Sequence, residues 1–191
     1  MNRFFVFLIL VSGLAFSSPA VAGEELLVNS SFEEQGESAD FAKGWSRWGN
    51  WINRETGWNP VLDGKCLLGY HHWQIEKDET SGFYQDIENV QPGRMCTFSI
   101  HANADAIAEG QQGPVSVEIR LETTVYDEQS VVISQRYEVS DLAGGTEWSR
   151  LCVRAKTPNN RLRALVVITP AKGKVLRAGA LKFDKASVVL D

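Results

Sequence analysis

The sequence lacks the short motifs that mark many catalytic centres. It contains no Gly-x-Ser-x-Gly elbow, no His-Glu-x-x-His and no phosphate-binding loop. A glycosidase needs two carboxylates held at a set distance across a cleft. The tryptophan-rich part of the chain offers only Glu55 and Asp63, and no feature of the sequence pairs them. We therefore expect that the protein is not an enzyme.

Basic clusters and cysteines are also scarce. The formal net charge is −5, and an acidic chain without a Lys/Arg cluster argues against a nucleic-acid partner. The three cysteines are Cys66, Cys96 and Cys152. Their spacing matches no zinc motif. The sequence leaves open whether two of them form a disulfide.

No apolar run of membrane-spanning length is present. The first 22 residues combine Arg3, the apolar stretch 4–16 and the small residues Ala20 and Ala22. This pattern predicts a secretory signal peptide, cleaved before Gly23, and its apolar run is too short to span a membrane comfortably. We expect a secreted or periplasmic protein with one folded domain over residues 23–191.

The sequence shows no pattern of amphipathic helices, repeats or linkers. Instead, apolar and polar residues alternate with a period of two in several stretches. In the stretches 115–122 and 161–169, every second residue is apolar, which is typical of strands with one buried face. About nine such strands are separated by turn signals. We therefore predict an all-β fold: a two-sheet antiparallel β-sandwich, most simply a jelly roll.

Tryptophan, by contrast, is concentrated in one stretch. Five of the six tryptophans lie in Gly44–Trp73, where interspersed Gly and polar residues predict irregular loops that end in a strand near Cys66–Tyr70. We assign Trp45 and Trp148 to packing. Indole rings stack well on the flat C–H faces of sugars, and polar side chains orient the hydroxyl groups. The candidate sugar-binding residues are Trp48, Trp51, Trp58, Trp73, Tyr70, His71, His72, Gln85 and Arg120.

Six fragments occur in an order that resembles the carbohydrate-binding modules of families four, nine, sixteen and twenty-two. They are LVNSSFEE at 27–34, GW at 44–45, DGKCLL at 63–68, GFYQDIENVQPGRMCTFSIHA at 82–102, TEWSRLCVRAKTP at 146–158 and LKFDKASV at 181–188. Ser31, Cys96 and Lys185 depart from the family pattern, which has Gly, Tyr and Asp there. The resemblance implies a jelly roll that binds a polysaccharide or oligosaccharide without catalysis, alone or beside a separate glycoside hydrolase.

The resemblance also implies a structural calcium ion near the chain ends. By position, Glu33 and Asp184 would supply carboxylates, and Ser31 and Lys65 would supply backbone carbonyls. Calcium prefers such a mixture of oxygen ligands. The alternative is that both carboxylates are ordinary turn or surface residues.

Two other functions stay open at this point. One is a surface adhesion or assembly module whose aromatic rings contact protein. The other is a jelly-roll polysaccharide lyase, in which Tyr70, His71, His72 and Tyr84 would be the candidates for base and acid.

Overall fold

The computed structural model describes residues 23–38, 40–49, 52–71, 79–105, 116–123, 131–157, 159–170 and 180–191. The expected signal peptide and the candidates Trp51, His72 and Trp73 lie outside these ranges. In the part of the chain that is described, no helix has the length and apolar character needed to cross a membrane.

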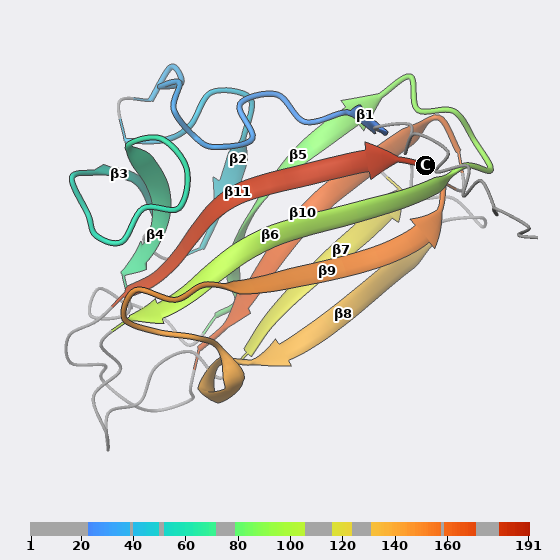
Figure 1. The fold of residues 1–191 in the computed structure, drawn as a ribbon. Coiled ribbons are helices and arrows are strands. Elements are labelled where there is room, and N and C mark those ends of the chain that lie inside the picture. The colour runs from blue at the N-terminus through green and yellow to red at the C-terminus, as the bar shows by residue number, and fades with distance from the viewer. Residues whose placement is uncertain are drawn as a thin grey trace, which may run out of the picture.

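Two antiparallel sheets are stacked face to face (Figure 1). The six-stranded sheet has the order β3-β4-β11-β6-β9, with β1 paired to β11. The five-stranded sheet has the order β2-β5-β10-β7-β8. Its long central strand β10 lies between β5 and β7, as β11 lies between β4 and β6 in the other layer.

The strands are short at the start of the chain and long in its second half. In chain order they are β1 (Glu24–Glu25), β2 (Ser46–Trp48), β3 (Ile52–Thr56), β4 (Cys66–His71), β5 (Ser81–Glu88), β6 (Met95–Asp105), β7 (Ser116–Thr123), β8 (Val132–Glu138), β9 (Ser149–Lys156), β10 (Arg161–Thr169) and β11 (Ala180–Leu190). One 3-10 turn, η2 (Val139–Asp141), follows β8. The all-β sandwich predicted from the sequence is confirmed.

The core forms between the sheets from one face of each strand. The alternating residues of β7 and β10 are buried as predicted, with Ile119 and Val166 inaccessible to solvent. Trp45 packs in this core too, with its ring centroid 5.2 Å from that of Phe32 and 5.8 Å from that of Phe83. Since every second residue points inward, the residues between them form the two outer faces of the sandwich.

The interpretation of Gly44–Trp73 as irregular loops was wrong in part. This stretch contains β2 and β3 as well as β4. β2 pairs only with β5, and β3 pairs only with β4, so both are edge strands. Edge strands tolerate short length and polar composition, and this is why their sequences resemble those of loops.

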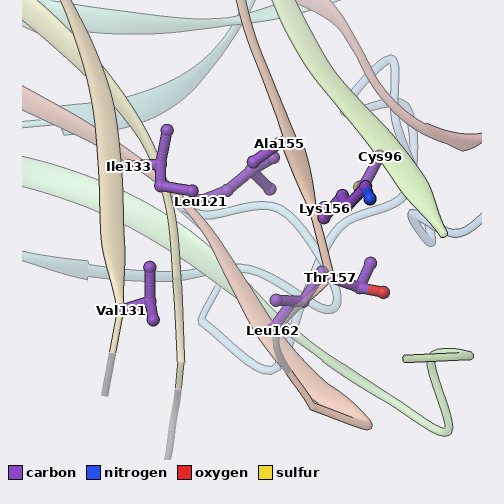
Figure 2. Close-up of a pocket in the computed structure, with 8 residues that line it drawn as sticks. All are labelled: Cys96, Leu121, Val131, Ile133, Ala155, Lys156, Thr157 and Leu162. Carbon is purple, nitrogen blue, oxygen red and sulfur yellow. The ribbon is translucent and has the colours of Figure 1, made fainter. Parts of the chain in front are cut away.

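The three cysteines are free thiols. Cys96 borders a small apolar cavity between the sheets, lined also by Leu121 and Leu162 (Figure 2). The cavity measures about 10 Å³, room for one water at most. Burial raises the pKa of Cys96 to about 11, which keeps it a thiol and chemically inert at neutral pH.

Candidate functional site

The outer face of the five-stranded sheet carries aromatic, apolar and charged side chains in ordered rows. Tyr84 of β5 lies opposite Leu165 of β10, which lies opposite Arg120 of β7. In the adjacent row, Gly82 and Glu118 flank Val167. The face therefore has an apolar centre, with aromatic rings on the β2 side and charges on the β7 side.

Trp48 lies close over its neighbour on β5, Gly82, because a glycine has no side chain in the way. A Cβ atom added to Gly82 would come within 2.1 Å of Cη2 of Trp48. Glycine inside a strand often marks such a close approach. The Trp48 ring is half-buried, and its centroid lies 6.3 Å from that of Tyr84 with an interplanar angle of 46°. Two aromatic rings thus form a twisted platform at the edge of this face.

Arg163 is fixed beside the platform by two kinds of contact. Its guanidinium carbon lies 4.0 Å from the centroid of the Tyr84 ring. Its Nε and Nη2 donate to the two carboxylate oxygens of Asp86, at 2.7 and 3.0 Å. A planar, bidentate pair of this type holds its side chains in one geometry. Tyr84 and Arg163 were not among the sugar-binding candidates, although their alternation with Phe83 and Leu162 placed them on an outer face.

Arg120, a predicted site residue, does lie on this face. It donates from Nε and Nη2 to the two oxygens of Glu118, at 2.9 and 3.1 Å. The hydrogen bond from Arg120 is the main cause that lowers the pKa of Glu118. Among the described residues of this outer face, the other two arginines also have acidic partners: Arg136 pairs with Glu138, and Arg161 pairs with Glu88. Each positive charge is therefore offset by a carboxylate.

The remaining predicted sugar-binding residues do not gather at this platform. Tyr70 is fully buried in the core. Gln85 is buried as well, and its amide accepts from the Val28 N–H at 2.7 Å and donates to the Val28 carbonyl at 2.9 Å. Trp58 and His71 lie on the outer face of the other sheet, since they contact each other and His71 alternates with the core residue Tyr70.

The same geometry separates the candidates for a lyase base and acid. Tyr70 points into the core, His71 points out of the six-stranded sheet, and Tyr84 points out of the five-stranded sheet. These three side chains do not face one substrate.

The proposed calcium ligands converge on the loop that joins β3 to β4. Oε1 of Glu33 accepts the backbone N–H groups of Lys65 and Cys66, at 2.7 and 2.8 Å. Oδ2 of Asp184 accepts those of Leu62 and Asp63, at 2.8 and 2.9 Å. Both carboxylates thus anchor the same five residues of chain.

The electrostatics of the two carboxylates differ. Burial raises the pKa of Glu33, but the N–H donors of Lys65 and Cys66 outweigh it and hold the pKa below its ordinary value. Burial raises the pKa of Asp184 to about 6, despite the N–H groups that it accepts. Asp184 is inaccessible to solvent and forms no ion pair with a basic side chain of the described residues.

These groups fit a calcium ion in their chemistry. The carbonyls of Ser31 and Lys65 accept no hydrogen bond from the described residues, so both oxygens are chemically available as ligands. Hard oxygen ligands of mixed type are what calcium takes. The described residues hold no cluster of three or more His, Cys, Asp or Glu side chains suited to a metal, so carbonyl oxygens would have to complete any coordination shell.

Gly64 makes this carboxylate-anchored loop possible. Its φ is +70°, and an added Cβ would lie 2.2 Å from Oε1 of Glu33. Gly64→Ala is expected to displace Glu33 from its two N–H donors and to lower the free energy of unfolding by roughly 2–3 kcal/mol. Chemical denaturation measures this loss.

Gly57→Ala is the matched control for Gly64→Ala. Its φ is +77°, but nothing lies within 4 Å of an added Cβ. It should cost only the left-handed backbone penalty of about 1 kcal/mol. Equal losses in the two variants would contradict a special role for the Glu33 contact.

No family model matches the chain, and no curated protein does either. Solved structures do match. The chain is similar to a family 61 carbohydrate-binding module in complex with β-1,4-galactotriose, at 16% identity and a TM-score of 0.54, over 88% of this chain and 99% of that one. A family 16 module matches at 13% identity and a TM-score of 0.56, over 86% and 99%. The chain shares the fold of carbohydrate-binding modules.

The same fold also occurs in enzymes. A cyclase from Fischerella sp. TAU matches at 15% identity and a TM-score of 0.62, over 89% of this chain and 98% of that one. In a bacteriophage CBA120 tailspike protein, the chain covers only 21% of the longer protein. These similarities establish the jelly-roll architecture. They do not distinguish a binding module from an enzyme, so the function has to be argued from the residues of the site.

Proposed function

We propose that this protein is an exported, non-catalytic carbohydrate-binding protein that holds an uncharged polysaccharide on the outer face of its five-stranded sheet. The observation that carries this proposal is the platform of Trp48 and Tyr84, seated over Gly82 and beside the fixed guanidinium of Arg163. Sugar rings stack on the indole and phenol, and the neighbouring polar groups bind hydroxyls. Such shallow sites correspond to a Kd of about 1 µM to 1 mM.

The form of the ligand follows from the angle between the rings. An interplanar angle of 46° between Trp48 and Tyr84 gives no common plane. A flat crystalline surface would touch one ring at a time, whereas a single twisted chain can follow both. The platform therefore favours a soluble single chain.

The charge of the ligand follows from the ion pairs. All four arginines on the described outer face have carboxylate partners, Asp86 and Glu118 among them. A uronate or sulfated polymer would find no unpaired cation there and would meet carboxylates of its own sign. An uncharged chain can use the remaining N–H groups and carboxylate oxygens without displacing a partner.

The experiment compares polymers that share a backbone and differ in charge. Hydroxyethylcellulose is paired with carboxymethylcellulose, and galactan with carboxymethylated galactan, in affinity electrophoresis at physiological salt. Retardation by an uncharged member alone is the expected result. Retardation by the anionic members alone would overturn the charge argument. If no glycan of a broad panel binds, the result would favour a protein-binding adhesion module.

Asp86→Asn provides a sharper test of the charge argument. The substitution keeps the shape of the side chain but removes one carboxylate charge beside Arg163. Because the pair is partly exposed, we expect a gain in binding to the anionic polymer of up to about fivefold at low salt. Arg163→Gln in the same background should remove that gain. An unchanged preference in Asp86→Asn would contradict charge pairing as the source of selectivity.

A further inference from the structure

A second tryptophan is seated on a strand glycine, on the opposite outer face of the sandwich. Trp58 follows β3 and lies over Gly69 of β4. A Cβ added to Gly69 would come within 2.8 Å of Cζ3 of Trp58. Gly69 lies between the core residues Leu68 and Tyr70, so it faces outward. Trp58 is half-buried, as Trp48 is on its own glycine. The same local arrangement therefore occurs once on each sheet.

An accessible carboxylate, positioned by a buried histidine, lies near the Trp58 ring. The ring meets His71 edge-on, with centroids 5.1 Å apart and an interplanar angle of 64°. Nε2 of His71 lies 2.6 Å from Oε1 of Glu55. The Glu55 side chain is 20% exposed, and its other oxygen has no partner among the described residues. His71 itself is buried, so the groups open to a ligand are the indole face and the carboxylate oxygen, and the imidazole contacts both side chains.

The loop that carries Trp58 is held in place by buried charges. Lys182 of β11 donates from Nζ to the Asn59 carbonyl. Two residues further along β11, Asp184 accepts the N–H groups of Leu62 and Asp63. A ring fixed before binding loses less entropy when a sugar arrives. Trp58 contacts Gly69 and His71, and its ring is not part of the buried core cluster.

We infer that Trp58 and Glu55, positioned by the buried His71, form a second sugar-binding site, which makes the protein bivalent. This inference rests on the proposed function, because the occupant is a unit of the same uncharged polysaccharide. The two platforms lie on opposite outer faces, so one protein molecule can join two polysaccharide chains. Each site is weak alone, and a long polymer gains avidity from engaging both sites.

Isothermal titration calorimetry with xylotetraose, cellotetraose and β-1,4-galactotriose tests the inference. The sugar that binds is expected to do so at two sites per protein molecule. Trp58→Ala and Trp48→Ala should each leave one site, and the double variant should leave none. A stoichiometry of one in the wild type that Trp58→Ala does not change would overturn the second site and leave the proposed function intact. Loss of binding through Trp58→Ala alone, with Trp48→Ala silent, would instead overturn the proposed location at Trp48.

Two further variants keep the test independent of folding. Glu55→Gln keeps the size of the side chain and should weaken the second site severalfold while leaving the first unchanged. Leu62→Ala is the matched control, since Leu62 is an exposed residue of the same loop and should leave both sites intact.

Light scattering from a mixture with hydroxyethylcellulose or galactan, whichever binds, reports cross-linking. The wild type should raise the scattering, and neither single tryptophan variant should. Equal scattering from the wild type and Trp58→Ala would contradict bivalency.

Discussion

Trp48→Ala is expected to weaken binding of an uncharged oligosaccharide at the five-stranded sheet by roughly 30-fold. A stacked sugar ring covers on the order of 80 Å² of apolar surface, worth about 2 kcal/mol at 25 cal/mol per Å². The alanine removes this contact and also the ring that lies next to Tyr84 on this face. Calorimetry in a Trp58→Ala background isolates this site from the opposite face.

The fold should survive Trp48→Ala. Trp48 ends the edge strand β2 and is not part of the buried core cluster, unlike Trp45. Trp48→Phe should keep most of the affinity because a flat ring remains. Val132→Ala is the matched control, since Val132 is 53% exposed on β8 of the same sheet. If Trp48→Ala binds as tightly as the wild type while its melting temperature is unchanged, the stacking platform is not the binding site.

Much of the architecture was accessible from alternation alone. Strands such as β7 and β10 have one apolar face each, and that pattern predicts both their existence and their buried residues. The short strands β2 and β3 were not found, because Ser46–Trp48 and Ile52–Thr56 are too brief and too polar to show a period. Their strand state depends on pairing with β5 and β4, which no local pattern encodes.

The division of the tryptophans between two faces was equally inaccessible. From the sequence, Trp48, Trp58, Tyr70 and His71 are all sugar-binding candidates. The structure assigns β2 and β3 to different sheets, so Trp48 and Trp58 lie on opposite outer faces. Alternation does separate Tyr70 from His71, but only the pairing of β4 with β11 determines which of them enters the core. Local spacing shows which residues are candidates for a site. Only the pairing of distant strands decides which of these candidates lie on the same face.

Asp184→Ala is expected to lower the free energy of unfolding by about 3–5 kcal/mol, the largest stability loss that we anticipate. The carboxylate is inaccessible to solvent and accepts the N–H groups of Leu62, Asp63 and Lys185. Without it, three backbone donors lose their acceptor, at roughly 1–3 kcal/mol each before the loop relaxes. Urea denaturation measures the loss. Asp63→Ala is the control, because Asp63 is exposed and should change stability by less than about 1 kcal/mol.

A second substitution at Asp184 tests the calcium ion that the family resemblance implies. If calcium binds the carboxylates of Asp184 and Glu33, calcium at a hundredfold excess over its Kd should stabilise the wild type by about 2.7 kcal/mol. Asp184→Asn, which keeps the size of the side chain, should abolish that response. A chelator should not change the stability of this variant. A wild-type melting temperature that calcium does not move would mean that backbone N–H groups alone hold the two carboxylates. In that case the loop with Trp58 is anchored by hydrogen bonds only, and sugar binding should be insensitive to chelation.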